Sequence, residues 1–590
     1  MHYMRLLRLA CLLPSSSALA AAAGVDATDQ HAEQRVKQVA VIGAGAGGSS
    51  AAYHLRKYAQ QAGIEVNITV FEKTARIGGR TLTVNVYDDP VFPVELGASI
   101  FVAVNHILFN ATKEFGLPVT EPGATDEKGI LGVWDGKNFV YTQDSESWGW
   151  WNLAKLVWKY GTTPYYTNRL VQRTIATFLK LYEAPYFPFR SLSTRAFELG
   201  LVQATSVTGL QFLAENELDG PFAHDIVQTS TRVNYASNLP YIHGLGTMVA
   251  MAPEGAMAVA GGNWQIFSHM VTHSQAYVSL NSTVTSITKE ESGNPDSASP
   301  RYQIKTAAPE VGETTHPITF DDVILAAPYQ FSGIQHADDL IPHPVDTIPY
   351  VKLHVTLFSS PYRFSPAFFG LEPASRVPSS VLTTLGPDEE APEPGSSGNG
   401  SAGSAGFFSA TLVKTVTNPR TQSKEYVYKI FSPEKVTPGF LSKLLGVQIP
   451  ETFVTETEKG GDEEKEEAAE GESATTLVEP ISWYYPAVFH PYPQKYPRVT
   501  FQDPILGDGL WYTSGVESFI STMETSALMG MNVARLIVDD YLSVSRAAAG
   551  DIEKSDDVVA EVTPPVLAEE KAQDVLAGQQ SEVAEDAGEL

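Results

Sequence analysis

The alternation of hydrophobic and polar positions is most regular near the start of the chain, where an apolar run leads into closely spaced glycines. Residues 39–42 read Val-Ala-Val-Ile, and Gly43, Gly45 and Gly48 follow with the spacing G-x-G-x-x-G. This order predicts a buried strand, a tight turn and a helix over residues 47–58. Because a helix start presents unpaired N–H groups, the pattern predicts a site for the phosphates of a dinucleotide.

A second strand is predicted directly after that helix. Residues 65–71 carry apolar side chains at alternate positions, and Glu72 follows them. A strand, a helix and a parallel strand form a βαβ unit, in which a carboxylate at the tip of the second strand accepts hydrogen bonds from ribose hydroxyls. The charge of Glu72 would repel the 2′-phosphate of NADP, so the pattern favours NAD or FAD.

Three later segments are predicted to extend the same fold. Residues 277–287 alternate like a half-buried strand, and residues 321–328 contain the apolar run of a fully buried strand. Residues 521–527 open a helix that we expect to run to about residue 538. The chain is therefore predicted to belong to the α/β class.

Two motifs beyond Glu72 distinguish between the cofactors. Gly78-Gly79-Arg80 follows Glu72, and Glu95-Leu96-Gly97-Ala98-Ser99 follows after residues 81–94. Their joint order resembles the FAD-binding signature of the flavin amine oxidase and GDP-dissociation-inhibitor superfamily. The resemblance implies FAD, with Arg80 at its pyrophosphate and with Gly97 and Ala98 close to the flavin ring.

The same resemblance implies roles for later residues. It places Val284 beside the adenine, includes Gly515 in the flavin site and makes Glu517 a candidate partner of the ribityl chain. It also points the N–H groups of the helix start at Met523 and Glu524 toward the flavin O2 atom, where they would stabilise an anionic reduced ring.

Short blocks narrow the resemblance to the prenylcysteine oxidase (prenylcysteine lyase) family. The blocks are residues 93–101 with Asn105, 233–235, 261–263, and 521–527 with 532–534, and the similarity covers roughly residues 36 to 545. Membership would imply FAD-dependent oxidative cleavage of the thioether of farnesyl- or geranylgeranyl-cysteine to cysteine, a prenyl aldehyde and hydrogen peroxide. A flavin amine oxidase and a non-catalytic prenyl-binding protein are the alternatives.

The domain organisation follows from these assignments. We expect a discontinuous Rossmann-like FAD-binding domain with an inserted α+β substrate domain. The FAD-binding domain comprises residues 35–120, 269–332 and 499–545, and the substrate domain comprises residues 121–268 and 333–498. Aromatic segments of the substrate domain, among them 148–151, 158–160, 165–166 and 182–187, would suit the wall of a prenyl groove, although each ring also fits an ordinary core.

The reaction implied by the family needs few protein groups. His243 is a candidate for handling the proton of the attacking water, and a purely structural histidine is the alternative. Arg232 is a candidate for binding the substrate carboxylate, and Asn263 is a second candidate substrate-binding residue. The thirteen histidines show no metal-binding spacing, so no metal site is expected.

Composition and charge add limits to this assignment. The net charge is −28, of which residues 456–472 carry −7 and residues 551–590 carry −10, leaving −11 for the rest. Nucleic acid is therefore not an expected partner. We expect residues 386–406 and 455–475 to be disordered insertions and residues 546–590 to be a disordered acidic tail.

The first residues are typical of a targeting segment. Arg5 and Arg8 lie around the short apolar core of residues 6–13, which predicts a signal peptide over residues 1–23 and a secretory, lysosomal, vacuolar or extracellular location. No run of about 18 apolar residues predicts a transmembrane helix. The single cysteine, Cys11, lies in that peptide, so we expect FAD to be bound non-covalently.

N-glycosylation motifs occur at Asn67, Asn110, Asn281 and Asn399. We expect packing in the sheet to shield Asn67 and Asn281, and Asn399 to be the best acceptor because it lies in a predicted loop.

Overall fold

A computed structural model describes most of the chain. The described residues are 36–121, 129–144, 149–253, 255–290, 301–309, 311–337, 340–342, 344–395, 400–450 and 480–548. The chain up to Val538 forms one compact unit, and a second unit begins at Asp539.

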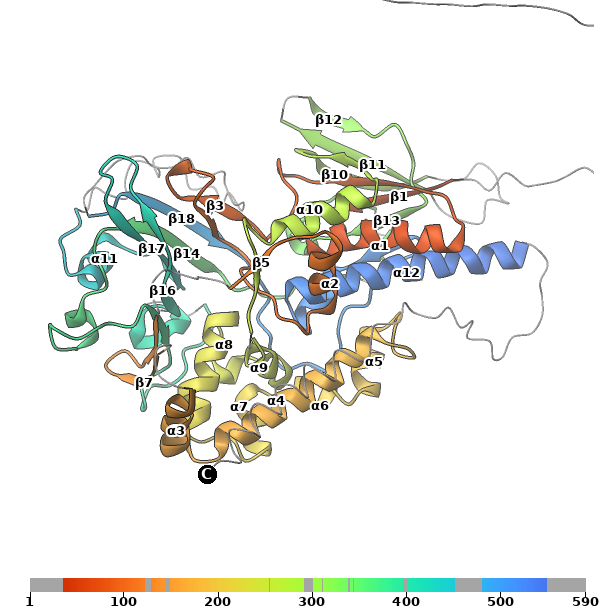
Figure 1. Ribbon diagram of the computed structural model, residues 1–590. Helices are drawn as coiled ribbons and strands as arrows, with labels where there is room; N and C mark the ends of the chain where they lie inside the picture. The colour runs from red at the N-terminus through yellow and green to blue at the C-terminus, as the bar shows by residue number, and fades with distance from the viewer. Residues whose placement is uncertain are drawn as a thin grey trace, which may run out of the picture. The chain divides into compact units, whose positions relative to one another are not determined.

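A six-stranded sheet carries the glycine-rich turn (Figure 1). Its order is β19-β20-β13-β1-β2-β9, and every pair is parallel except β19 with β20. The strands are β1 (Lys37–Ile42), β2 (Val66–Phe71), β9 (Tyr277–Ser279), β13 (Asp322–Leu325), β19 (Ile505–Gly507) and β20 (Leu510–Tyr512). Strand β1 lies in the middle, where Val39 and Val41 have no exposed surface, because a strand covered on both faces must be apolar throughout.

Helix α1 (Ala46–Ala62) connects β1 to β2 and extends beyond the predicted range. Its C-cap, Gly63, adopts φ +68°, a left-handed conformation that favours glycine. Helix α12 (Met523–Ala548) is also longer than predicted, although only its part up to Val538 belongs to the first unit. A Cβ added at Gly530 of α12 would lie 2.2 Å from the carbonyl oxygen of Gly47 in α1, so the absent side chain permits this close helix contact.

The prediction of one strand over residues 277–287 is wrong. Asn281 has φ +51° and separates β9 from β10 (Thr283–Glu290). Strand β10 joins a separate three-stranded sheet with β11 (Arg301–Ala308) and β12 (Gly312–Thr315). Val284 is buried in this second sheet, in the core that it shares with β13.

A seven-stranded sheet is built from the stretches assigned to the substrate domain. Its order is β18-β14-β17-β16-β15-β6-β7. The strands are β6 (Ile130–Trp134), β7 (Phe139–Asp144), β14 (Leu353–Ser360), β15 (Ser380–Thr383), β16 (Ser409–Thr417), β17 (Lys424–Ser432) and β18 (Trp483–Phe489). Short strand pairs are β3 (Thr83–Asn85) with β4 (Pro93–Glu95), and β5 (Val119–Thr120) with β8 (Ala258–Val259).

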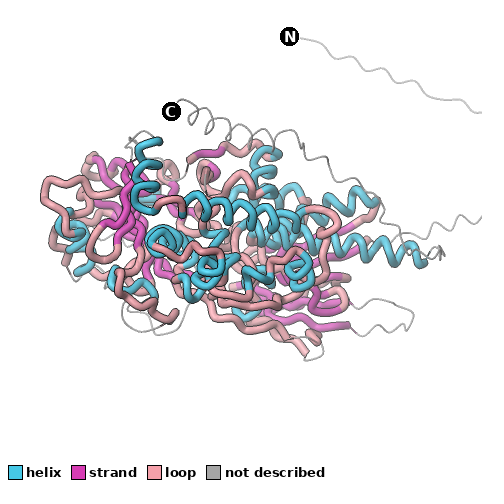
Figure 2. Tube along the Cα trace, turned by 90° about the horizontal axis from the view of Figure 1, so that it is seen from below, coloured by secondary structure: helices cyan, strands magenta, loops and turns pink. Residues whose placement is uncertain are grey.

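Helices from the same stretches form a layer beside these sheets (Figures 1 and 2). They are α3 (Gly149–Tyr160), α4 (Thr163–Leu179), α5 (Leu192–Glu198), α6 (Val202–Thr205), α7 (Gly209–Glu215), α8 (Gln228–Tyr235) and α9 (Gly244–Ala250). The remaining helices are α2 (His106–Glu114), α10 (Trp264–His273) and α11 (Pro438–Leu445). No helix in the described ranges is both long and apolar enough to cross a bilayer.

The prediction of disorder over residues 386–406 is wrong for its described parts. Ala402 is fully buried, and the carboxylate of Glu389 accepts hydrogen bonds from the backbone and hydroxyl of Ser404 at 2.6 and 2.8 Å. The segment is held by polar contacts that its low apolar content does not reveal. The predicted insertion at 455–475 and the tail from 549 onward lie outside the described residues.

The expected shielding of two glycosylation motifs is also wrong. Asn67 and Asn281 are both exposed, as is Asn110 on α2. Asn67 points outward because it precedes the part of β2 that pairs with β9. Asn399 lies outside the described residues.

Candidate functional site

The glycine-rich turn lies at the carboxyl end of β1. Gly43 adopts φ +103°, and a Cβ there would approach the carbonyl oxygen of Ala326 to 3.0 Å. A Cβ on Gly48 would lie 1.9 Å from the carbonyl oxygen of Gly43, so helix α1 can follow this closely only with glycine at that position. Gly45 is the N-cap of α1, and neither a capping side chain nor an acidic residue occupies the first turn. The helix start is therefore suited to an anion.

The second glycine pair packs against the first turn. The N–H of Gly78 donates to the carbonyl oxygen of Ala44 at 2.9 Å, and a Cβ on Gly79 would lie 3.0 Å from Cα of Gly45. Both Gly78 and Gly79 have positive φ. This contact explains why both motifs need glycine, since any side chain would separate the two turns.

Glu72 lies at the tip of β2, as predicted, and is almost fully buried. Its carboxylate accepts the N–H of Ala44 at 2.8 Å and both the N–H and hydroxyl of Thr74 at 2.9 and 2.8 Å. The carboxylate thus connects the glycine-rich turn to the end of β2. Its expected role toward a ribose stays a prediction.

Arg80 and Glu517 are brought together, although the resemblance assigned them to different parts of the cofactor. The guanidinium donates two hydrogen bonds to the carboxylate, at 2.8 and 2.6 Å, and a third to the carbonyl oxygen of Pro491. The Tyr350 hydroxyl donates to the same carboxylate at 3.0 Å. Burial favours the neutral form of Arg80, but the charge and hydrogen bonds of Glu517 outweigh it and raise the pKa of Arg80.

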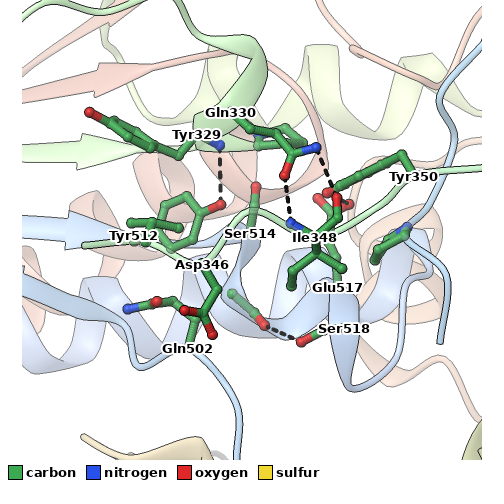
Figure 3. A pocket seen from close by; sticks show the side chains of 14 residues that line it. Tyr329, Gln330, Asp346, Ile348, Tyr350, Gln502, Tyr512, Ser514, Glu517 and Ser518 are labelled. Carbon is green, nitrogen blue, oxygen red and sulfur yellow. Dashed lines mark hydrogen bonds between the residues drawn. The ribbon is translucent and has the colours of Figure 1, made fainter. Parts of the chain in front are cut away.

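A pocket opens beside this ion pair, at the carboxyl ends of β13 and β20 (Figure 3). It is lined by segments 328–330, 345–350 and 512–518 together with Pro493 and Gln502, and its open space, including the part that faces solvent, is about 340 Å³. In parallel α/β sheets ligands bind at the carboxyl ends of the strands. Both this pocket and the glycine-rich turn lie at that edge, and Gly515 and Glu517 line the pocket. Their roles toward a flavin stay predictions.

The Gly97-Ala98 segment is held by groups from two other elements. A Cβ on Gly97 would lie 1.9 Å from the carbonyl oxygen of Arg80, which accounts for the glycine. Lys429 of β17 donates to the carbonyl oxygen of Glu95 at 2.7 Å and to the hydroxyl of Ser99 at 2.9 Å. Burial lowers the pKa of Lys429 and raises that of Glu95, and the opposite charge of each partner resists this shift.

Asn263 also belongs to this cluster. Its N–H donates to the Glu95 carboxylate at 2.6 Å, its side-chain amide donates to the carbonyl oxygen of Ala98 at 3.3 Å, and its amide oxygen accepts the N–H of Val259. Asn263 is fully buried. The assignment to substrate is therefore replaced by a role in fixing the Gly97-Ala98 segment.

Glu524 does not face the candidate cofactor site. Both of its carboxylate oxygens accept backbone N–H groups, from Ile107 at 2.9 Å and from Leu108 at 3.0 Å, so it caps helix α2 from a distant part of the chain. Burial raises the pKa of Glu524 to about 7. Met523 is buried in the apolar core that includes α2. These contacts account for the two side chains, whereas the direction of the N–H groups of this helix start toward a flavin stays a prediction.

His243 is the N-cap of α9. Its Nδ1 accepts the N–H of Gly246 at 2.9 Å, and its Nε2 lies 3.4 Å from the carbonyl oxygen of Ser518. The ring is fully buried, and burial together with the charge of Lys495 lowers its pKa to about 3. The structural alternative is therefore the one observed, because neither ring nitrogen is free to exchange a proton with water.

Arg232 is likewise structural. It is fully buried on α8, and its donors bind Thr383, Asn238 and the carbonyl oxygens of Ser401 and Ala402. Burial lowers the pKa of Arg232 to about 9. All five guanidinium N–H groups are occupied, so none is available for a substrate carboxylate.

Lys495 is a buried cation that sequence reasoning missed. Its ammonium nitrogen lies 4.0 Å from the ring centre of Tyr235 and 4.9 Å from that of Tyr492, and it has no hydrogen-bond partner among the described residues. Burial, aided by Arg80 and opposed by Glu517, lowers its pKa to about 7. The segment 490–498 is rich in proline and aromatics and gives no local signal that one lysine turns inward.

Several aromatics expected in a prenyl groove lie in solvent. Trp158 is 93% exposed, and Tyr165 and Tyr166 are more than half exposed, whereas Tyr160 and Leu181 belong to the helical core. The expectation is therefore wrong for these three rings. No cluster of three or more metal-ligating side chains occurs within the part of the chain that the structure describes.

The parallel sheet, the glycine-rich turn and the open helix start define a dinucleotide-binding protein of the Rossmann type. The profile of the NAD(P)-binding Rossmann-like domain accordingly matches residues 41–115. The profile of the prenylcysteine lyase family matches residues 143–550, and the chain belongs to that family.

Characterised relatives match over most of the chain. Farnesylcysteine lyase of Arabidopsis thaliana is 27% identical over 547 residues, which cover 89% of this chain and 93% of that protein. Prenylcysteine oxidase 1 of Bos taurus is 28% identical over 527 residues, and that of Homo sapiens 25% over 520 residues, each covering 85% of this chain and 88% of the relative. The chain is thus homologous to prenylcysteine oxidases, which are flavin-dependent oxidoreductases.

Similar solved structures are amine oxidases. A triple mutant of putrescine oxidase is 15% identical with a TM-score of 0.49, and cyclohexylamine oxidase from Brevibacterium oxydans is 14% identical with a TM-score of 0.49. Each covers 86% of this chain and 100% of its own chain.

Proposed function

We propose that the protein binds FAD non-covalently and oxidises S-prenyl-L-cysteine, with O2 and water, to cysteine, a prenyl aldehyde and hydrogen peroxide. The observation that carries this proposal is the family match over residues 143–550, joined to a dinucleotide-binding unit in the same chain. The relatives named farnesylcysteine lyase and prenylcysteine oxidase support the substrate class.

The residues of this chain fit such a cofactor. The uncapped start of α1 offers N–H groups to a pyrophosphate, and Gly45 places no side chain in the way. Glu72 would receive the ribose hydroxyls, and Glu517, held by Arg80 and Tyr350, would face the ribityl chain. The Gly97-Ala98 segment, held by Lys429 and Asn263, would form one wall for the ring.

When bound, FAD supplies the acceptor for a hydride from the allylic carbon attached to sulfur, and O2 restores the oxidised cofactor with release of hydrogen peroxide. The protein has to exclude bulk water, orient the thioether and hold the one water that adds to that carbon. Glu95 and Lys429 are the buried titratable groups beside the Gly97-Ala98 segment, and Lys495 lies near Glu517.

Flavin spectroscopy tests the proposal. The purified protein should absorb near 450 nm, and anaerobic S-farnesyl-L-cysteine should bleach that band with release of one prenyl aldehyde per flavin. Admission of air should then restore the band and give one hydrogen peroxide per flavin. Bleaching by putrescine or a monoamine in place of the thioether would establish the amine oxidase alternative. A protein that binds the thioether without bleaching would be a non-catalytic carrier.

The compartment is part of the proposal. The signal-like first residues and the exposed motifs at Asn67, Asn110 and Asn281 support passage through a glycosylating secretory route toward a lysosome, a vacuole or the extracellular space. Loss of mass on treatment with an N-glycosidase, and recovery in the lumenal fraction, would test it.

A further inference from the structure

Large apolar side chains are more than half exposed to solvent where α3 is followed by α4. Val157 is 52% exposed, Trp158 93%, Tyr165 64% and Tyr166 53%. Only two residues separate the helices, and the rings of the two tyrosines lie 5.3 Å apart. We call this group, residues 157–166, the α3–α4 tip. Because tryptophan is highly buried on average, a tip of this composition indicates a surface that covers it.

The charge around the tip is opposite to that of the whole chain. Residues 147–182 contain five lysines and arginines and no acidic residue, whereas the chain carries −28. Lys159 is already neutralised by Asp225 at 2.7 Å, and Lys180 lies at the far end of α4. Lys155, Arg169 and Arg173 remain as exposed cations near the tip.

Helical spacing places these cations on the same faces as the aromatics. Lys155 and Trp158 are three residues apart on α3, and Tyr165, Arg169 and Arg173 follow one another at intervals of four on α4. The opposite face of α4 is buried, through Thr167, Leu170, Val171, Thr174 and Phe178. Helix α4 is therefore amphipathic, and the exposed surface of α3 and α4 combines aromatic rings with positive charge.

We propose that the α3–α4 tip docks on an anionic lipid surface. Indole and phenol rings favour the headgroup level of a bilayer, and neighbouring cations are attracted to anionic lipids. A protein partner with acidic side chains would neutralise the cations but would need a preformed recess for Trp158, whereas a bilayer accommodates a protruding ring at any position. In Figure 1 α3 and α4 lie at the lower edge of the ribbon, away from the six-stranded sheet, so docking leaves the cofactor edge free.

The inference goes beyond the proposed function, because it concerns a lipid surface and requires neither flavin nor substrate. If both hold, docking brings the enzyme to the phase in which an S-prenyl amino acid dissolves. A fifteen-carbon chain strongly prefers lipid, at about 0.8 kcal/mol per buried CH₂.

The test is binding of the full chain to vesicles, measured by flotation. Vesicles of phosphatidylcholine with 30% phosphatidylserine should bind the wild type, more weakly in high salt, and pure phosphatidylcholine vesicles should bind less. The double variant Lys155→Gln/Arg173→Gln should lower the affinity roughly 25-fold, at about fivefold per cation. The triple variant Trp158→Ser/Tyr165→Ser/Tyr166→Ser should lower it roughly tenfold or more.

A matched control separates docking from general stickiness. Phe197 on α5 is 75% exposed but has no comparable neighbours, so Phe197→Ser should bind as the wild type does. Brominated lipids should quench part of the wild-type tryptophan fluorescence, and Trp158→Phe should remove that part while binding persists. The proposal is overturned if the wild type does not bind anionic vesicles. It is also overturned if the protein forms a dimer in solution that the triple variant abolishes, because a second copy would then cover the tip. Equal losses in Phe197→Ser and the triple variant also overturn it.

Discussion

Replacing Arg232 by methionine should destabilise the protein without a specific effect on substrate binding. Three of the five acceptors of the guanidinium keep another donor. The amide oxygen of Asn238 still accepts from the Gln228 side chain, and the carbonyl oxygen of Ser401 still accepts from the Asn238 amide. The carbonyl oxygen of Thr383 still accepts from the Thr229 hydroxyl. The hydroxyl of Thr383 still donates to the carbonyl oxygen of Phe407, and the carbonyl oxygen of Ala402 loses its charged donor.

The magnitude follows from those losses. Five charged hydrogen bonds are lost, and at about 1.5–3 kcal/mol each they sum to about 7–15 kcal/mol. Most of this sum is offset, because removing the guanidinium also removes a desolvation penalty of several kcal/mol and because most of the acceptors keep another partner. We expect Arg232→Met to lower the free energy of unfolding by about 2–4 kcal/mol and to expose residues 400–402 to protease.

Urea denaturation followed by fluorescence measures the change, with the exposed Arg173→Met as control, which should lie within about 0.5 kcal/mol of the wild type. Steady-state kinetics with S-farnesylcysteine and with its analogue lacking the carboxyl group provide the second measurement. Unchanged stability, together with a KM raised only for the carboxylate substrate, would refute the structural role and restore Arg232 as a substrate ligand.

Three further predictions address other groups. Glu72→Ala should weaken FAD binding by about 1.5–3 kcal/mol through lost hydrogen bonds, and unchanged affinity by fluorescence titration would remove Glu72 from the site. The pKa of Glu524 is about 7 in the folded state against an ordinary 4.5, so the protonated form of Glu524 stabilises the fold. This stabilisation, about 3 kcal/mol, should be lost as the pH rises from 4.5 through 7. Glu524→Gln should therefore flatten the pH profile of the unfolding free energy relative to the wild type, and parallel profiles would contradict the raised pKa of Glu524. If an apolar groove holds the prenyl chain, the kcat/KM of S-farnesylcysteine should greatly exceed that of the five-carbon S-prenylcysteine, because each buried CH₂ contributes about 0.8 kcal/mol. Equal kcat/KM values would exclude such a groove.

Local patterns predicted the parts of the molecule whose chemistry is local. The G-x-G-x-x-G turn, the helix after it and the carboxylate at Glu72 all lie within one stretch, and the structure places them as predicted. The contact of the Glu524 carboxylate with α2 was not predicted, because its partners lie 416 and 417 residues away and a glutamate in the first turn of a helix looks the same whether it faces a ligand or another helix.

Charge posed a similar problem in the middle of the chain. An arginine is ordinarily exposed or bound to an anion. The sequence around Arg232 does not indicate that its guanidinium binds the carbonyl oxygens of residues 401 and 402. The prediction that Trp158 lines a groove was wrong for a different reason. An apolar sequence pattern does not say whether the surface that covers it belongs to the same chain.

The strand order of the six-stranded sheet has a consequence for biosynthesis. Strand β1 is made among the first residues of the folded unit, its neighbour β13 comes some 280 residues later, and β20 is made close to the end, just before α12 packs its Gly530 against the backbone of Gly47. The nucleotide-binding unit thus stays unclosed until the ribosome has produced almost the whole first unit, and its apolar strand needs protection during that interval. Under the proposed function, FAD would bind only after most of the chain has been made, and a chain that ends before residue 505 would lack β19 and β20 at the edge of the sheet.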